Sequence, residues 1–356
     1  MRSKEFLLKI ANVPGGSGAE EHVGAFLIEQ TKDLVTESYR DRVGNVVLVK
    51  KNTKNIANPP KIMVATHMDE ITLMVSFIEP GGFLRVTQVG GFDPRTLLAQ
   101  EVVVHSRTGD YLGVIGAKPP HLSTPEERKK AVPLDDLFID VGMPEALVKE
   151  KISLGDRVTL HRQAQELLHD RIAGKAMDNR ASMAAMHVCL EALQQLDTVV
   201  DVYGVGTISE EIGSLGAQMS AYSIHPDIAV AIDVCHGETP GVASDLVQKL
   251  GGGPVIALGP NIHPKLYQRF KELAKNLAMD VQLELTQAVT STDADPVQVV
   301  KEGIPTALLS IPLRYMHTCV EMLDFQDVEQ VGQLLAHFIA SIDEKFVEGL
   351  SCYLND

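Results

Sequence analysis

Five residues spread along the chain have the side-chain types that hold a pair of zinc-like cations: His67, Asp178, Glu211, Asp233 and His317. Each stands at the end of an apolar run or at a sharp turn, where an α/β sheet delivers side chains to one crevice beyond its strand ends. A sixth residue, Glu210, directly precedes one of the five and could move a proton. This set predicts a hydrolytic site.

His67 and Asp69 close an apolar run and, two residues apart, point in the same general direction. A carboxylate beside a metal-bound imidazole can accept its free N–H, which fixes the tautomer and makes the ring a better donor. Asp69 is therefore expected to orient His67. The alternative is a histidine that is merely polar at a strand end, because so short a motif has little specificity.

Asp178 precedes a helix rich in alanine and methionine, and taken alone it is best explained as an N-cap. The functional alternative is a carboxylate that bridges two cations, with one oxygen for each. The start of a helix would supply the rigidity that such a bridge needs.

Glu210 and Glu211 follow the apolar run 202–208 and could belong to a solvated loop. Glycines on both sides of the pair, at 204, 206, 213 and 216, instead indicate close backbone packing. Because adjacent side chains diverge, Glu211 can hold a metal while Glu210 moves a proton. A glycosidase pair is less favoured, since its carboxyl groups must flank a sugar bond at roughly 5–9.5 Å.

The elements that must position these residues alternate between strands and helices. Apolar runs at 46–49, 62–65, 199–208, 228–233 and 306–310 predict strands, and helices are expected from Ala181, from Pro264 and after Asp324. Ser17 and Glu20 match a capping box at the start of an early helix. This alternation predicts an α/β domain of the zinc-peptidase type with a mixed sheet.

Short β-type runs separated by turn signals replace this alternation from about Ile71 to about Leu167. Many short strands without helices predict a small barrel or sandwich. The expected organisation is a catalytic domain formed by residues 1–70 and 168–356, interrupted by a β-barrel-like domain at 71–167.

Composition limits the partners. The 356 residues are 45% hydrophobic, and the net charge of −15 argues against nucleic acid and anionic membranes. The cysteines at 189, 235, 319 and 352 form no close pairs, so no disulfide framework is expected. The opening segment carries Lys4, Glu5 and Lys9, which predicts a short amphipathic helix rather than a signal peptide. A cytoplasmic protein is expected.

Taken in order, the motifs resemble those of the cytosolic dinuclear aminopeptidases, a family of glutamyl and deblocking aminopeptidases that form tetrahedral particles. The resemblance runs almost end to end, through His-x-Asp, Asp-Asn-Arg, Glu-Glu, a strand-end Asp and His-Thr-Cys-Val-Glu. It extends to the surrounding phrases Ala65–Ile71, Gly155–Asp156, Ser291–Ala294, Lys301–Thr306 and Pro312–Tyr315.

The resemblance implies two divalent cations per subunit, one held by His67, Asp178 and Asp233 and the other by Asp178, Glu211 and His317. Glu210 would be the general base and acid, and Asp69 would orient His67. Cations roughly 3.5–4 Å apart lower the pKa of a bridging water and polarise the scissile carbonyl. Zinc is expected, with cobalt or manganese allowed by the same ligand softness.

The implied enzyme removes residues from the free amino end of short peptides, and the barrel insertion mediates assembly into dimers and dodecamers. One rival keeps the metals but acts on N-acyl amino acids or as a carboxypeptidase. A rival of another class is a non-catalytic oligomeric scaffold that binds peptides. Buried acids without partners would be costly to keep in such a scaffold.

Two positions depart from the family pattern, Cys319 and Asp295-Pro296. The first leaves the ligand set intact, whereas the second falls in a segment that helps to shape the substrate pocket. Asp295 could favour a basic first residue by charge complementarity. The alternative is a solvated loop aspartate, because exposed charge pairs contribute little.

Overall fold

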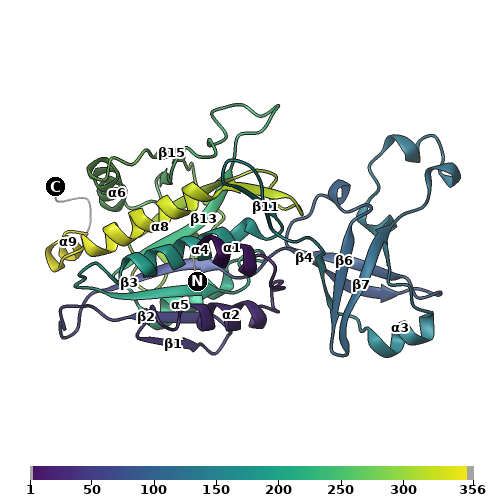
Figure 1. Ribbon diagram of the computed structural model, residues 1–356, viewed down its shortest axis with the longest axis horizontal. Helices are drawn as coiled ribbons and strands as arrows, with labels where there is room; N and C mark the ends of the chain where they lie inside the picture. The colour runs from purple at the N-terminus through teal and green to yellow at the C-terminus, as the bar shows by residue number, and fades with distance from the viewer. Residues whose placement is uncertain (1–2, 351–356) are drawn as a thin grey trace.

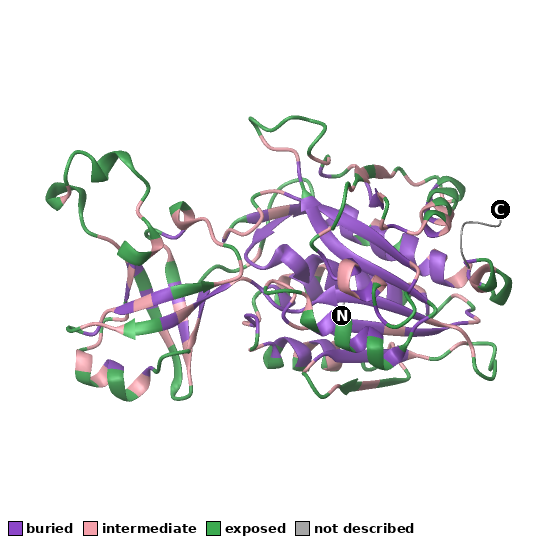
Figure 2. Ribbon diagram, turned by 180° about the vertical axis from the view of Figure 1, so that it is seen from behind, coloured by how far each residue is buried: buried purple, intermediate pink, exposed green. Residues whose placement is uncertain are grey.

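The computed structural model describes residues 3–350. A large layered body and a smaller barrel lie side by side, connected near β4 and β11 (Figure 1). Most buried residues lie in the centre of the body, as Figure 2 shows from behind. Met1, Arg2 and Cys352 lie outside the described residues.

An eight-stranded mixed sheet forms the middle of the body. Its order is β1 (Glu37–Arg40), β2 (Val46–Lys50), β12 (Asp201–Thr207), β3 (Lys61–His67), β13 (Ile228–His236), β16 (Thr306–Leu313), β14 (Val255–Leu258) and β15 (Gln282–Leu285). The four central strands β12, β3, β13 and β16 are parallel, so their carboxyl ends meet at one edge. They are buried almost throughout because helices cover both faces of the sheet.

Helices cover the two faces of the sheet unequally. One face packs against α1 (Ser3–Ile10), α2 (Glu21–Thr31), α4 (Met177–Ala192), α6 (Pro264–Asn276) and α8 (Phe325–Ala340). The other packs against α5 (Leu215–Ile224) and α7 (Ala294–Gln298), and α9 (Glu344–Glu348) ends the described chain. Gly332 lets α8 approach α4 closely, because a Cβ there would lie 2.5 Å from the Ala185 carbonyl oxygen.

The barrel is closed and antiparallel. Its strands, in order, are β4 (Thr72–Ile78), β5 (Leu84–Val89), β8 (Phe138–Asp140), β7 (Gly109–Gly116), β6 (Glu101–Ser106) and β9 (Arg157–Leu160). A separate apolar core fills it, and α3 (Glu145–Lys151) lies against it. The fold class predicted from the sequence, an α/β body with a mixed sheet and a small barrel, is confirmed.

A second small sheet lies where the chain returns from the barrel to the body. It consists of β10 (Gln165–Glu166), β11 (Arg171–Gly174) and β17 (Glu321–Asp324). β11 leads directly into Asp178, and β17 begins four residues after His317. None of the helices described for residues 3–350 has the length and hydropathy that a membrane span requires.

Candidate metal centre

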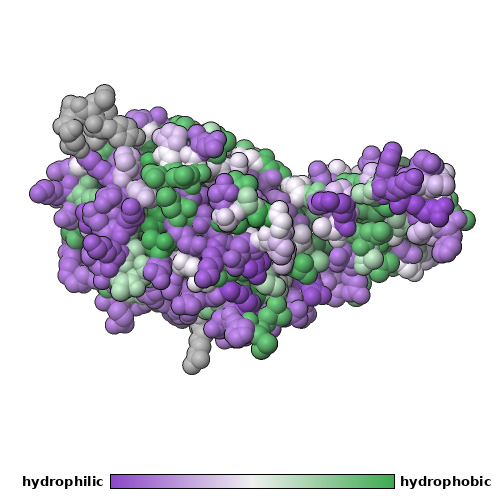
Figure 3. Space-filling model, turned by 90° about the horizontal axis from the view of Figure 1, so that it is seen from above, coloured by the Kyte–Doolittle hydropathy of each residue, from purple (hydrophilic) through white to green (hydrophobic). Residues whose placement is uncertain are grey.

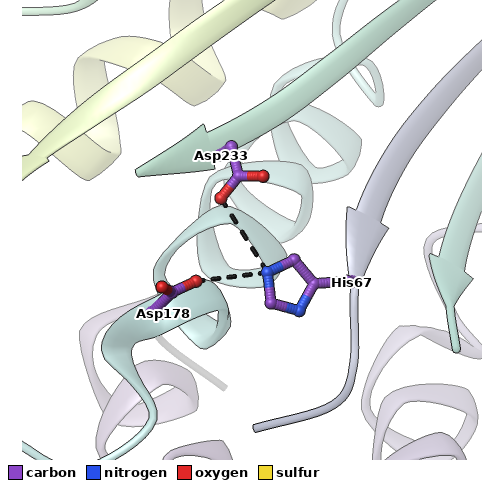
Figure 4. A group of neighbouring side chains, drawn as sticks. All are labelled: His67, Asp178 and Asp233. Atoms are coloured by element: carbon purple, nitrogen blue, oxygen red, sulfur yellow. Dashed lines mark hydrogen bonds and ion pairs between the residues drawn. The ribbon is translucent and has the colours of Figure 1, made fainter. Parts of the chain in front are cut away.

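Two neighbouring parallel strands deliver His67 and Asp233 to the same place. His67 is the last residue of β3, and Asp233 stands on β13 two residues beyond the Ala65–Ala231 pair of the ladder. The His67 Nε2 lies 3.8 Å from the Asp233 Oδ1 (Figure 4). Both side chains are buried, so the carboxyl ends of the strands form a rigid base for the site.

Asp178 brings its two carboxylate oxygens to two different histidines. Its Oδ1 lies 3.1 Å from His67 Nε2, and its Oδ2 lies 3.3 Å from His317 Nε2. Asp178 lies at a kink at the start of α4, where it and Asn179 have non-helical backbone angles. Its carboxylate is thus directed at the two histidines, which the N-cap explanation favoured for Asp178 alone did not predict.

Glu211 and His317 complete a second group from loops that follow strands. Glu211 lies beyond the end of β12 and His317 beyond the end of β16, and His317 Nε2 is 3.5 Å from Glu211 Oε2. Within each of the groups His67–Asp178–Asp233 and Asp178–Glu211–His317, the possible ligand atoms lie within 4.8 Å of one another. Both groups and Glu210 line one cavity of about 710 Å³.

Asp69 holds more of the site than its spacing from His67 predicted. The imidazole Nδ1 lies 3.1 Å from the Asp69 carbonyl oxygen and 3.5 Å from its carboxylate. That carboxylate also accepts hydrogen bonds from the main-chain N–H groups of Glu210 and Glu211, at 3.0 and 3.2 Å. One buried aspartate thus positions the histidine and the adjacent acids together.

Glu210 belongs to neither group. Its Oε2 lies 4.0 Å from His67 Nε2, and its Oε1 accepts a hydrogen bond from the Ser214 hydroxyl at 3.2 Å. Burial raises its pKa, and the positive charge of His67 opposes that rise. A carboxyl group in this position can both accept and donate a proton.

The buried charges of the centre are poorly balanced by the protein alone. Burial raises the pKa of Asp233 and of Glu211 well above their usual values, and the Asp178 carboxylate raises both further. Burial acts to lower the pKa of His67, but its bonds to Asp178 and Asp69 raise it well above the usual value. A divalent cation in each group would compensate this negative charge, so the residues fit the metals that the sequence implies.

Glu321 is a supporting residue to which sequence reasoning assigned no role. Its two oxygens accept main-chain hydrogen bonds from Asp178, at 3.1 Å, and from His317, at 2.8 Å. It fixes the backbone of the shared carboxylate and of the more exposed histidine. The His-Thr-Cys-Val-Glu motif contained this residue, but only the pairing of β17 with β11 brings it to Asp178.

The predicted capping box at the start of α2 is wrong. Ser17 donates instead to the Asp69 carboxylate at 2.6 Å, and Glu20 accepts the main-chain N–H of Ser209 at 3.0 Å. The N-cap residue of α2 makes no side-chain capping bond. Both residues hold the loops of the metal centre, because the segment before α2 packs against the end of β3.

Comparisons with known proteins place this fold and site in a family. Residues 44–334 match the M42 glutamyl aminopeptidase family. The chain is 38% identical to the lysyl aminopeptidase of Pyrococcus furiosus, over 93% of this chain and 94% of that protein. The chain therefore belongs to the M42 family of metal-dependent aminopeptidases, which are hydrolases of peptide bonds.

Solved structures agree over nearly the whole chain. The aminopeptidase APDkam598 from the archaeon Desulfurococcus kamchatkensis superimposes with a TM-score of 0.90 at 38% identity, covering 99% of both chains. The Pyrococcus horikoshii TET1 peptidase, described as assembling into a tetrahedron or a large octahedral shell, gives 0.82 at 29% identity, over 96% of this chain and all of that one. The resemblance found in the sequence is confirmed at the level of the family.

Proposed function

We propose that this aminopeptidase works with two divalent cations, one held by His67, Asp178 and Asp233 and the other by Asp178, Glu211 and His317. The observation that carries this proposal is the orientation of Asp178, whose two oxygens face two different histidines at 3.1 and 3.3 Å. A carboxylate shared by two cations needs one oxygen directed at each. Zinc suits this mixture of imidazole and carboxylate, and cobalt and manganese suit it by the same softness argument.

When bound, the cation pair makes a water molecule acidic and polarises the scissile carbonyl. The remaining steps belong to the protein. Glu210 takes the proton from the attacking water and delivers it to the leaving nitrogen. Asp69 keeps Glu210 in place through its main-chain N–H, and Ser214 orients the carboxylate.

The charge of the cavity favours the amino end of a peptide. The described residues that line it include several carboxylates and no lysine or arginine. With cations offsetting the ligand carboxylates, Glu210 and Glu284 still make the lining acidic, which attracts a protonated α-amino group. This distinguishes an aminopeptidase acting on short peptides from a carboxypeptidase, which needs a cation to hold the chain terminus.

A panel of aminoacyl chromogenic amides, assayed with added zinc, cobalt or manganese, tests the reaction and the metal together. Bound metal should approach two cations per chain, chelation should abolish activity, and readdition should restore it. Full activity at a stoichiometry that saturates at one cation would contradict the bridging role of Asp178.

We also propose that residues 71–167 form an oligomerisation domain inserted into a catalytic domain of residues 1–70 and 168–356. Apolar side chains gather on the face of the barrel that is seen from above (Figure 3). Leu112 and Val114, on the same side of β7, are 63% and 51% exposed. A second copy of the chain would cover such a surface, in a homo-oligomer that could extend to a dodecamer.

Light scattering tests the assembly: the protein should form a large particle, and Leu112→Glu with Val114→Glu should reduce it without removing the metal. An active, strictly monomeric enzyme at all concentrations would contradict it.

A cytoplasmic location is part of the same proposal, because Cys189, Cys235 and Cys319 are free and buried and the net charge is −15.

A further inference from the structure

Beside the metal centre, the cavity continues along the sheet to a carboxylate that the mechanism does not use. Glu284 on β15 lines the same cavity as His67 and Asp178. Its Oε2 accepts a hydrogen bond from the Ser310 hydroxyl on β16 at 3.1 Å. Ser310 pairs in register with Asp233, so these side chains lie on the same face of the sheet.

Strand order explains how Glu284 comes so close to the centre. β14 separates β15 from β16, and its residue opposite Glu284 is Ala257, whose methyl group leaves room for the longer side chain to cross. Asp233 and Ser310 are neighbours on adjacent strands, about 4.8 Å apart, and Glu284 lies one hydrogen bond beyond the Ser310 hydroxyl. The Glu284 carboxylate therefore lies beside the metal centre rather than within it, at a distance that suits the long side chain of lysine or arginine better than that of leucine.

Cys235 marks the path between the two carboxylates. It lies two residues beyond Asp233 on the same strand and lines the cavity. Asp233, Cys235 and Glu284 all line this one cavity, so a side chain that extends from the metal centre toward Glu284 stays inside it.

Glu284 has no cation of its own within the described part of the chain. No ion pair joins it to a lysine or arginine among residues 3–350, and the hydrogen-bond donor that it has there is the neutral Ser310 hydroxyl. Burial raises the pKa of Glu284, as expected for a carboxyl group that lacks a charged partner. A positively charged side chain that entered the cavity would supply that partner.

Asp295, the acid that the sequence singled out for this role, is already engaged. Its oxygens accept hydrogen bonds from Thr290 N and Ser291 N, each at 2.8 Å, and from the Asn261 amide at 3.2 Å. It holds the loop whose residues Thr290 and Ser291 line the cavity, and it is not itself among the lining residues.

We propose that Glu284 is the specificity residue of the cavity and accepts the side chain of an amino-terminal lysine or arginine. This inference rests on the proposed function, because it takes the scissile bond to lie at the metal centre. The stem of the side chain passes Cys235 and Met316, and its charged end meets the Glu284 carboxylate.

Comparison of lysyl with norleucyl amide isolates the charge, because norleucine has a similar stem without the amino group. In the metal-replete enzyme, lysyl and arginyl amides should be preferred, and Glu284→Gln should lower their kcat/KM by about 10–100-fold, the loss of a charge-assisted hydrogen bond. Norleucyl and leucyl amides should change little, since glutamine can still accept from Ser310. Glu284→Lys should move preference toward glutamyl amide.

Glu272→Gln is the matched control, because it makes the same substitution at an exposed position of α6. It should leave the ratio of lysyl to norleucyl turnover unchanged. An unchanged lysyl-to-norleucyl ratio in Glu284→Gln would overturn the specificity role while leaving the proposed function intact. Failure of the wild-type enzyme to cleave any aminoacyl amide with any of the three metals would instead contradict the proposed function.

Discussion

The two candidate ligand groups share Asp178 but differ in how the fold holds them. In the first group, His67 and Asp233 come from adjacent strands of the central sheet, and their side chains are 2% and 9% exposed. In the second, His317 comes from a loop and is 34% exposed, although Glu211 is only 6% exposed. The first group is built into the core of the body, whereas the second includes a more exposed histidine from a loop.

The second group also depends on the barrel. The His317 ring lies against Gly91, in the segment between β5 and β6, where an added Cβ would come within 3.3 Å of its Nδ1. His67 and Asp233 both come from strands within the body's core. The difference predicts a tight cation in the first group and a more exchangeable one in the second, since ligand rigidity sets how firmly a metal is held.

Substituting the adjacent acids Glu210 and Glu211 one at a time should give the largest effect on activity. Glu210 lies in neither group, so Glu210→Gln should keep both cations and lose kcat by about 10²–10⁴-fold, while substrate affinity changes little. Glu211→Gln should instead weaken the second group. Single-turnover assays combined with metal analysis measure both. If Glu210→Gln loses metal, and Glu211→Gln keeps its metal but turns over slowly, then Glu211 moves the proton and Glu210 is the ligand.

Removing one histidine at a time tests the comparison directly. His317→Ala should retain about one cation per chain, whereas His67→Ala should lose the tightly held one, because each removes a ligand from a different group. In the wild type, a graded chelator series followed by metal analysis should release the cations in two phases. A single phase that releases both together would show that the groups do not differ in affinity.

Glu321→Gln should weaken metal binding without removing a ligand. Changes to groups that orient ligands typically cost about 10–100-fold in metal affinity. Because Glu321 contacts the main chain of both Asp178 and His317, the second group should weaken more than the first. Competition with a metal-sensitive dye gives both constants, and Glu302→Gln, exposed and remote, is the control. Equal affinities in the two variants would contradict the supporting role.

The smallest effect on catalysis is expected from a change in the loop that contains Thr290 and Ser291 and lines the cavity. Asp295→Ala removes several hydrogen bonds to Thr290 and Ser291, so KM should rise a few-fold for every aminoacyl amide alike. Metal content should not change, and neither should the ratio of lysyl to leucyl turnover. A selective loss of lysyl activity would return the specificity role to Asp295.

Much of the arrangement could be predicted along the chain. Apolar runs located the central strands, and their polar ends identified His67 and Asp233 as side chains meeting at one edge. The hydrogen bonds that hold the site together between residues distant in the sequence could not be predicted in this way. Ser17 matched a local capping pattern, but its hydroxyl bonds to Asp69, 52 residues away, because tertiary packing offered a charged acceptor in place of a helix end.

The sequence by itself determined the residue types and order of the candidate ligands, the family and the alternation of elements, because these follow from side-chain chemistry and from local periodicity. Tertiary structure alone decided that the Asp178 oxygens face two histidines, and that Glu284 rather than Asp295 lines the cavity. Strand order causes this difference. β14 and β15 add to the sheet beyond β16, which brings Glu284 to Ser310, and no local pattern specifies that arrangement.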